Sequence, residues 1–231
     1  MSARPAKNGP LTIAIDGPAG AGKSTSAKDL ANALGLRYID TGAMYRGVAW
    51  AVVQAGVAPD DRKRVRAVLA RTALTVTDRA QPSLLVNGQD VSSKLRTPDV
   101  GEAASRLATV PEVRTYLVRT QRKMARGGGV VMEGRDIGTV VLPRADIKFF
   151  LDASVEERAR RRWKELRAKG RSEPRSAIEA AIRERDHRDR TRAVSPLRAA
   201  DDAVVLDTTR DSRARVKRML LDWVCRKTGV C

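Results

Sequence analysis

The sequence predicts a three-layer α/β protein built around one parallel sheet, and three observations support this fold class. An apolar run at residues 11–15 leads into a glycine-rich turn, and a segment with helical spacing follows. Helical segments then separate four further runs of strand length, at residues 37–40, 130–132, 147–151 and 203–206. Strands that alternate with helices are typical of a parallel sheet with helices on both faces. The 231 residues, 42% of them hydrophobic, suffice for one domain with a substantial core.

The glycine-rich turn is the most specific feature of the chain, because it matches the phosphate-loop pattern G-x-x-x-x-G-K-[ST] between a strand and a helix. Its glycines let backbone N–H groups turn inward, and the helix that follows adds unpaired amides and a positive dipole end. Lys23 supplies a charge for the β- and γ-phosphates, and the Ser24 hydroxyl is placed to ligate Mg²⁺. The residues expected to bind ATP are Gly17, Pro18, Ala19, Gly20, Ala21, Gly22, Lys23, Ser24 and Thr25.

An antiparallel patch is expected within residues 60–100, outside the main sheet. Residues 59–70 have the pattern of a basic amphipathic helix, and two apolar segments follow, at residues 74–78 and 84–86. The Asn87-Gly88 dipeptide is a strong hairpin signal. Further helices are expected at residues 26–34 and 43–54, from Thr97, at 111–126 and at 211–226.

The formal charge of +18, from 45 basic and 27 acidic residues, predicts anionic partners. Nucleic acid is disfavoured, because aromatic residues make up only 3% of the chain and form no visible platform for stacking bases. Nucleotides are favoured, because residues 154–198 hold 15 Arg or Lys against 8 Asp or Glu in segments that read as a helical hairpin. No apolar run is long enough to span a membrane and no secretory signal is visible, so we expect no membrane partner and a cytoplasmic location.

Four further motifs make the phosphate loop more informative. They are Asp40-Thr-Gly-Ala-Met-Tyr-Arg46, Ala103-Ala-Ser-Arg106, Glu133-Gly-Arg-Asp-Ile-Gly-Thr-Val-Val141 and the arginine-rich run from Glu184 to Pro196. With these five motifs in this order, the chain resembles the bacterial cytidylate kinases over about residues 11–225. The resemblance implies a phosphotransferase that uses ATP and Mg²⁺ to convert CMP and dCMP into CDP and dCDP.

The resemblance also implies a division of the chain. It predicts a P-loop NTPase core of residues 11–58, 97–153 and 193–226, with a five-stranded parallel sheet. An insertion that binds the nucleoside monophosphate (NMP) would span residues 59–96, and a helical lid 154–192. Residues 1–10 would be a flexible N-terminus. A monomer is expected.

The resemblance implies three groups of residues that bind CMP. Arg46, Arg135 and Arg192 would hold the phosphate, for which a planar guanidinium fork is suited. Contacts to the ribose are implied for Thr41, Arg185 and Asp189. Ser105, Arg114 and Asp136 would contact cytosine, whose amino group needs an acceptor while its N3 and O2 need donors. The catalytic residues expected are Lys23, Arg135, Arg188 and Arg192.

The residue chemistry agrees with a kinase of this kind, because an anionic acceptor hardly needs a general base but repels the triphosphate strongly. Arg185, Asp189 and Arg192 are spaced to share one helix face, where guanidinium groups can converge. Ordinary surface pairing along a helix is the simpler explanation of such charges, and it accounts well for Asp186 with Arg190. Lid arginines of the family would lie within residues 158–175, but Arg158 and Arg162 receive no role.

Two departures from the family pattern concern the metal. Glu133 stands where many relatives carry Asp, and Ser24 where some carry Gly, so Ser24 alone is the expected Mg²⁺ ligand and a contribution from Glu133 stays open.

Two other functions remain as alternatives: another small P-loop kinase, acting on a different monophosphate or on shikimate, and a nucleotide-switched nucleic-acid-binding protein. The antiparallel insertion and the Ser105/Asp136 pair argue against the first. The preference between CMP and dCMP and the tolerance for UMP are left open.

Overall fold

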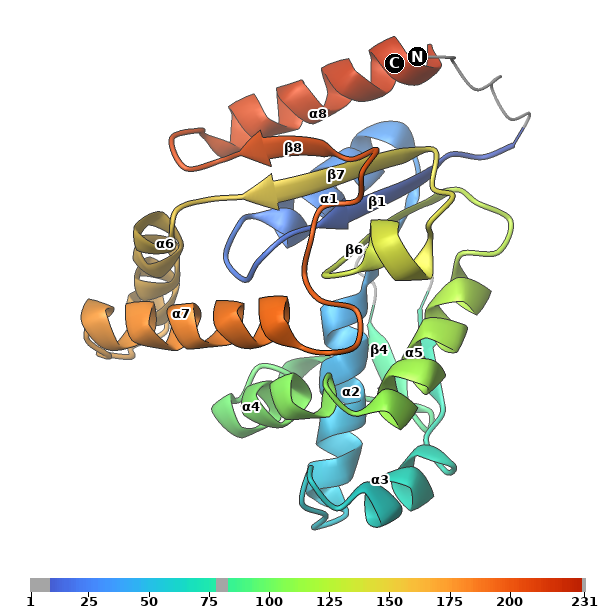
Figure 1. Cartoon of the computed structure of the whole chain (residues 1–231), viewed down its shortest axis with the longest axis vertical. Helices are drawn as coiled ribbons and strands as arrows, with labels where there is room; N and C mark the ends of the chain where they lie inside the picture. Colours follow the sequence, from blue (N-terminus) through green and yellow to red (C-terminus); the bar gives the residue numbers. More distant parts are fainter. Residues whose placement is uncertain (1–8, 78–82, 230–231) are drawn as a thin grey trace.

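A five-stranded parallel sheet forms the centre of the protein in the computed structural model, which describes residues 9–77 and 83–229 (Figure 1). All four strand pairings are parallel, in the order β2-β6-β1-β7-β8. This arrangement confirms the predicted fold class. The strands are β1 Thr12–Asp16, β2 Arg37–Asp40, β6 Val130–Gly134, β7 Ile147–Asp152 and β8 Val204–Asp207.

Helices cover both faces of this sheet. Because successive side chains of a strand point to opposite faces, the residues of one strand divide between two apolar clusters. Ile13 and Ile15 of β1 belong to one apolar cluster, and Ala14 between them belongs to another. Helices α1 (Lys23–Leu34) and α8 (Arg213–Thr228) pack on the first cluster. Three helices pack on the second, namely α2 (Thr41–Gln54), α4 (Pro98–Leu107) and α5 (Pro111–Met124).

The antiparallel patch is present as a second, three-stranded sheet that follows the basic helix α3 (Arg62–Leu69) in the chain. Its strands are β3 Leu74–Val76, β4 Leu84–Val86 and β5 Gln89–Asp90, with a short helix η1 (Ser92–Lys94) after them. Asn87 and Gly88 both have positive φ, 51° and 82°, as a two-residue hairpin turn between β4 and β5 requires. The two-residue strand β5 was not predicted, because it is too short to carry a pattern. Residue 78 of the predicted segment 74–78 lies outside the described residues, as do residues 1–8.

Helices α6 (Val155–Ala168) and α7 (Arg175–Thr191) form the predicted basic hairpin. Ser154 caps α6 by accepting from the Glu157 amide at 3.2 Å. The hairpin has its own small apolar cluster, made by Ala159, Leu166, Ile178 and Ile182. Between β6 and β7 lies a feature that sequence patterns did not predict, the π-helix η2 (Ile137–Val141).

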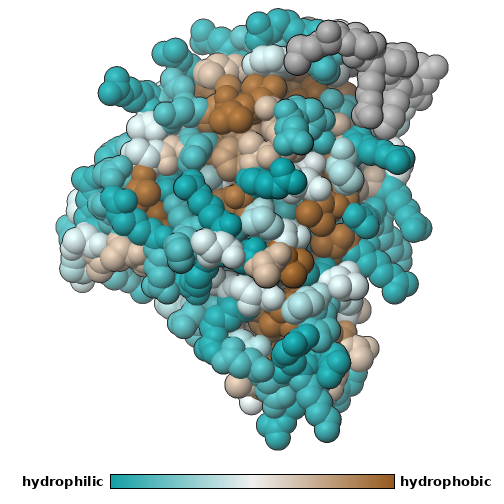
Figure 2. All heavy atoms as spheres, in the orientation of Figure 1, coloured by the Kyte–Doolittle hydropathy of each residue, from teal (hydrophilic) through white to brown (hydrophobic). Residues whose placement is uncertain are grey.

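The surface is largely hydrophilic. On the face shown in Figure 2, hydrophobic side chains gather only in separate patches between hydrophilic ones. Within residues 9–77 and 83–229, the large hydrophobic residues that are exposed are Val194, Val205 and Trp223. None of the helices in these ranges combines the length and apolarity needed to cross a bilayer.

Candidate active site

Sequence motifs far apart in the chain meet at the carboxyl edge of the parallel sheet, because β2, β6 and β1 are neighbours there. Asp16 at the end of β1 lies opposite Gly134 of β6, and Asp40 at the end of β2 lies opposite Glu133. The phosphate loop, Thr41 and the Arg135-Asp136 pair therefore leave the sheet side by side. This edge is where α/β proteins of this kind bind their ligands.

The phosphate loop has the backbone that its glycines make accessible. Gly20 and Gly22 have φ of 80° and 91°, in the left-handed region that favours glycine. The Lys23 ammonium is buried and donates to the Pro18 carbonyl at 2.7 Å. Burial, and next the nearby Arg135 charge, lower the pKa of Lys23 well below its usual value. A negatively charged ligand beside the loop would therefore favour the protonated ammonium form of Lys23.

The start of α2 carries Thr41 and Arg46. Asp40 caps the helix by accepting from the Ala43 amide at 2.8 Å, and it also accepts from Arg46 at 3.2 Å. The buried Thr41 hydroxyl donates to the Glu133 carbonyl at 2.7 Å, so toward a ligand it can only accept. Arg46 thus reaches the site from β2's side of the phosphate loop.

Arg114 and Asp136 form a buried ion pair that joins α5 to the turn after β6, although they are 22 positions apart. The Tyr45 hydroxyl accepts from Arg114 at 3.1 Å. Burial raises the pKa of Tyr45 to about 12, so its hydroxyl remains protonated. Two of the residues implied in cytosine binding are therefore held together. Ser105, the third, lies half-buried on α4.

The end of α7 meets the same turn. Arg135 donates to Asp189 at 2.9 Å, so a residue implied in phosphate binding is held by one implied in ribose binding. Burial, and next the Arg135 charge, lower the pKa of Arg185 to about 10. Arg192 stands just past the helix as its C-cap and donates to the Ser195 carbonyl at 2.6 Å. The predicted helix face that Arg192 was to share therefore ends before this residue, and the turn after α7 directs the Arg192 side chain.

Unsatisfied donors concentrate among these arginines. In residues 9–77 and 83–229, nine buried side-chain atoms lack a hydrogen-bond partner, and five of them belong to arginines of this site. A buried donor without an acceptor costs about 1–3 kcal/mol, so such a concentration is expected where an anionic ligand supplies the acceptors. The five atoms are Arg46 Nε, Arg114 Nε, Arg185 Nε, Arg188 Nε and Arg192 Nη2.

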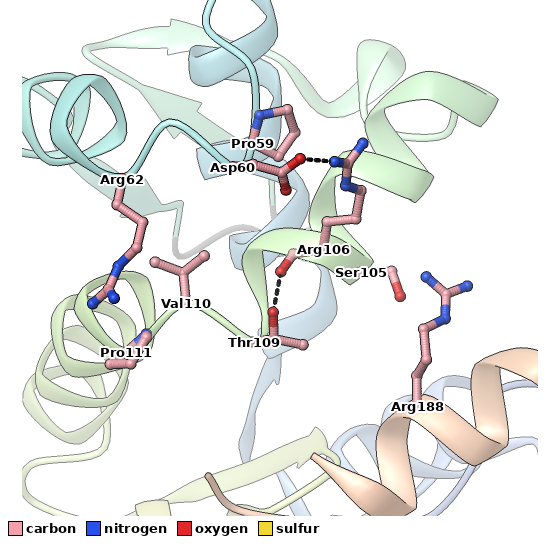
Figure 3. Close-up of a pocket in the computed structure, with 9 residues that line it drawn as sticks. All are labelled: Pro59, Asp60, Arg62, Ser105, Arg106, Thr109, Val110, Pro111 and Arg188. Carbon is pink, nitrogen blue, oxygen red and sulfur yellow. Dashed lines mark hydrogen bonds and ion pairs between the residues drawn. The ribbon is translucent and has the colours of Figure 1, made fainter. Parts of the chain in front are cut away.

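A pocket of about 460 Å³ opens between α4 and α7 (Figure 3). Ser105 of α4 and Arg188 of α7 point toward each other on one side of the pocket, and the Asp60–Arg106 ion pair lines another side. Arg188 is 40% exposed and makes a long ion pair with Glu184 at 3.5 Å, so it is free to turn toward a bound ligand. The pocket is therefore lined in part by Ser105 and Arg188, two of the predicted site residues, and no phosphate-loop residue lines it.

The residues present fit a Mg²⁺ ion next to the phosphate loop. Ser24 is exposed at the start of α1, and the buried Glu133 carboxyl lies beside its hydroxyl. Burial, and next the charge of the nearby Asp40, raise the pKa of Glu133. A cation bound beside these two carboxyl groups would therefore favour their ionised forms. Tyr38 fixes Glu133 by donating to it at 2.9 Å. No cluster of three or more metal-ligating side chains is present within residues 9–77 and 83–229.

Asp16 is a site residue that the motifs did not single out. Its buried carboxylate accepts from the Ile137 amide at 2.8 Å and the Gly138 amide at 2.7 Å, which fixes the start of η2 just after Arg135 and Asp136. Burial raises the pKa of Asp16 to about 6. The available signal was a single charge at the end of an apolar strand, directly before the phosphate loop.

The predicted pairing of Asp186 with Arg190 is wrong. Asp186 is buried and pairs with Arg158 of α6, while Arg190 pairs with Asp152 at 3.7 Å. Helical spacing identified neither partner, because both contacts join separate elements. Arg162, by contrast, makes an exposed pair with Glu165 on its own helix.

Comparison with known proteins agrees with this geometry. The cytidylate kinase family model matches residues 13–225. A cytidylate kinase of Desulfitobacterium hafniense is 49% identical over 199 residues, which is 86% of each chain. One of Carboxydothermus hydrogenoformans is 45% identical over 95% of this chain and all of its own. A bifunctional pantoate ligase/cytidylate kinase of Synechocystis is 48% identical over 91% of this chain and 42% of its own.

Among solved structures, a gluconokinase from Sinorhizobium meliloti superimposes with a TM-score of 0.50 at 16% identity, over 96% of each chain. At this identity the likeness supports the fold alone. The family model and the relatives together cover nearly all of the sheet, the phosphate loop and the arginine cluster. The chain therefore belongs to the cytidylate kinase family.

Proposed function

We propose that this protein transfers the γ-phosphoryl group of ATP to CMP and dCMP. The observation that carries this function is the group of arginines near the phosphate loop that each keep one buried nitrogen without an acceptor. Arg46, Arg135 and Arg192 would bind the acceptor phosphate, with their fixed forks directed at its oxygens. Both substrates are anionic, so several guanidinium groups are needed to bring them together.

Cytosine recognition would depend on the Arg114–Asp136 pair and Ser105. Asp136 accepts only when ionised, and the amino group of cytosine donates, whereas uracil presents a carbonyl oxygen at the same position. Arg114 would donate toward N3 and O2. Thr41, Arg185 and Asp189 would contact the ribose. Asp189 also holds Arg135, so the sugar and the phosphate would be read by connected side chains.

Phosphoryl transfer would require charge stabilisation more than proton transfer. Lys23 would stay with the transferred phosphoryl group, and Arg135, Arg188 and Arg192 would neutralise charge shared by the two substrates. Ser24 would hold a Mg²⁺ ion, with Glu133 beside it, and the ion would neutralise part of the charge of the triphosphate.

We also propose that the chain is divided into segments with different functions. Residues 59–96 would form the NMP-binding insertion and residues 154–192 the lid, on a core of residues 11–58, 97–153 and 193–226. The protein would act as a monomer. A cytoplasmic location fits nucleotide substrates of this kind.

A coupled assay of ADP release tests the function with CMP, dCMP, UMP, AMP, GMP and shikimate as acceptors. CMP and dCMP should give the highest kcat/KM. Preference for AMP, GMP or shikimate would instead support another small P-loop kinase, and tight nucleic-acid binding with a steep salt dependence would support the nucleic-acid alternative.

Lys23→Met distinguishes the donor site from the acceptor site in the same assay. The variant should lose about 100- to 1,000-fold in kcat, as for removal of one group that stabilises transition-state charge. Its affinity for CMP should stay within about twofold of the wild type, because Lys23 belongs to the donor site. Full activity of the variant with Mg-ATP would overturn the donor-site assignment.

A further inference from the structure

The α6–α7 hairpin is joined to the phosphate loop by polar contacts rather than by a shared core. Its apolar cluster, Ala159, Leu166, Ile178 and Ile182, is separate from the two clusters that cover the sheet. The position of α7 relative to the phosphate loop must therefore be set largely by hydrogen bonds and ion pairs.

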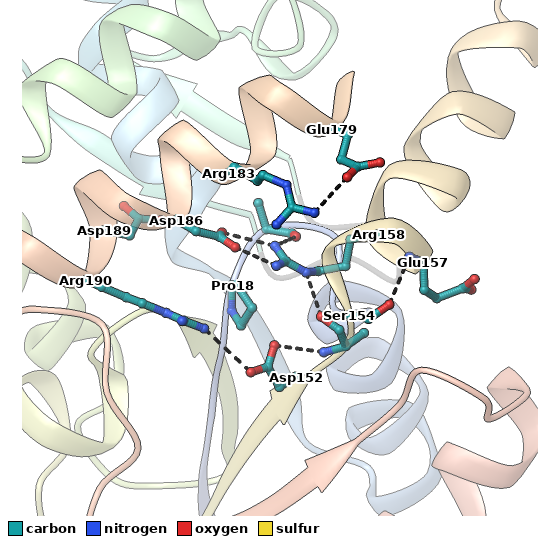
Figure 4. Close-up of polar contacts among 12 residues, drawn as sticks. Pro18, Asp152, Ser154, Glu157, Arg158, Glu179, Arg183, Asp186, Asp189 and Arg190 are labelled. Carbon is teal, nitrogen blue, oxygen red and sulfur yellow. Dashed lines mark hydrogen bonds and ion pairs between the residues drawn. The ribbon is translucent and has the colours of Figure 1, made fainter. Parts of the chain in front are cut away.

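Two arginines of α6 make these contacts: Arg161 donates to the Gly20 carbonyl at 3.5 Å, and Arg158 donates to the Ala19 carbonyl and also reaches α7. The Arg158 guanidinium is only 2% exposed and donates to three separate parts of the chain (Figure 4). Nε donates to the Ala153 carbonyl at 2.8 Å, and Nη1 to the Ala19 carbonyl of the phosphate loop at 3.2 Å. Nη1 and Nη2 both donate to the Asp186 carboxylate of α7, the former at 3.0 Å. All three nitrogens are engaged, and the planar fork fixes the angles between the three partners.

Asp186 is well placed to pass this constraint on. It follows Arg185 directly and lies one turn before Asp189, which holds Arg135. Other pairs that link the hairpin, Arg183 with Glu156 and Arg190 with Asp152, have exposed arginines and contribute little. Arg158 is thus the buried link between the donor loop and the helix that carries the acceptor residues.

We infer that Arg158 is a positioning residue that couples the two substrate sites. It holds the Ala19 carbonyl and the Asp186 carboxylate on one rigid fork, so a shift of the phosphate loop on nucleotide binding moves α7, and the reverse. The inference rests on the proposed function, because it needs ATP and CMP at the sites described. It gives Arg158 no contact with either substrate.

Arg158→Lys tests the coupling, because lysine keeps the charge but not the fork. The dissociation constant of CMP is measured by calorimetry with and without saturating Mg-AMP-PNP, and the ratio of the two values is the coupling factor. A factor of about 5 to 150 in the wild type is typical of coupled sites, and it should fall toward one in the variant. Arg160→Lys is the matched control, since Arg160 is 42% exposed and its ion pair within residues 9–77 and 83–229 is with Glu157 of the same helix, and it should keep the wild-type factor.

The outcomes separate this inference from the proposed function. Failure of the wild type to bind CMP would overturn the function. A wild type that binds CMP with a factor of one, or an Arg158→Lys variant that keeps the wild-type factor, would overturn only the coupling role. A variant that is merely less stable, with an unchanged factor, would show Arg158 to be a structural anchor.

Two measurements cover the case in which Arg158→Lys does not fold. Asp186→Asn removes the partner charge but keeps the Arg158 bond to Ala19, and it should also reduce the factor. In the wild type, Mg-AMP-PNP alone should shift the backbone amide resonances of Arg185 and Asp186, and CMP alone those of Ala19 and Gly20. Absence of both sets of shifts would overturn the inference without any variant.

Discussion

At the scale of single residues, hydrogen-bond satisfaction separates two uses of buried arginine. All three nitrogens of Arg158 have protein acceptors, so this side chain holds elements together. Arg46, Arg114 and Arg192 each keep a buried nitrogen without a partner, as expected of side chains that await a ligand. The residue type is the same, and only the surroundings decide its role.

Specificity for cytosine should depend on Asp136. In Asp136→Asn, the carboxamide can present an N–H to the carbonyl of uracil, so the preference for CMP over UMP should fall by about 10- to 100-fold in kcat/KM. Steady-state kinetics with both acceptors checks this. Asp201→Asn is the control, because its side chain is fully exposed and its ion pair among the described residues is with Arg198.

An unchanged preference in Asp136→Asn would assign base selection to Ser105 and Arg114 instead. Equal losses for CMP and UMP would have a different meaning. They would show that the variant had only released Arg114, whose buried charge needs Asp136 as a partner.

The positions of residues within compact motifs were predictable from the sequence, because a motif fixes its own local geometry. Lys23, Thr41 and the Arg135-Asp136 pair fall at the carboxyl ends of neighbouring strands for this reason. The partners of Arg158 and Asp16 were not predictable. Asp16 and its amide partner Ile137 are 121 positions apart, and nothing in the spacing of the chain identifies such a pair.

At the scale of elements, the short helix η2 shows how a backbone segment is held ready for function. A π-helix is rare and is often found at functional sites. Here Asp16 accepts from the first two amides of η2, so one buried carboxylate sets the direction in which Arg135 and Asp136 leave β6. No length or periodicity signal distinguishes such a five-residue element from a loop.

This arrangement predicts a pH dependence of stability. The pKa of Asp16 rises from 3.8 to about 6, chiefly through burial. Since the folded state holds the proton more tightly, the stabilisation from protonated Asp16 is complete below pH 3.8 and is lost as the pH rises through about 6. The free energy of unfolding of the wild type minus that of Asp16→Asn should therefore decrease between these pH values, by up to about 3 kcal/mol. Urea unfolding at a series of pH values measures it, and a difference independent of pH would contradict the assignment.

The α6–α7 hairpin should behave as a lid whose base is fixed and whose far end moves. Contacts of Arg158 and Arg161 with the phosphate loop hold the start of α6, whereas the connection near Gly170 is exposed. Amide hydrogen exchange in residues 154–192 should slow mainly when CMP and a non-hydrolysable ATP analogue are both bound, because the arginine excess then faces anions on both sides. Full protection in the free protein would show that the hairpin is a rigid part of the core.

At the scale of the whole molecule, the parallel sheet, the long helices and their layers followed from the sequence, because alternation of apolar runs with helical segments leaves few arrangements open. The charge of +18 was less informative by itself. Many of the basic residues lie in exposed ion pairs, such as Arg198 with Asp201, and these pairs contribute little to stability. We expect the part of the charge that bears on function to be the few arginines that keep a buried nitrogen without an acceptor.

Ligand binding should therefore stabilise the whole fold more than salt does. CMP at about 100 times its dissociation constant should add about 2.7 kcal/mol to the free energy of unfolding, and for a chain of this size this corresponds to roughly 5–10 °C in Tm. Sodium chloride at equal ionic strength screens the surface charges but is not held by the guanidinium forks, so its effect should be smaller.

Arg192→Ala should reduce the CMP shift at fixed CMP concentration, while Arg218→Ala, on the exposed face of α8, should not. Thermal unfolding of the three proteins measures these shifts. If sodium chloride reproduced the full shift, relief of general repulsion would explain it, and the unsatisfied arginines would not form an anion site.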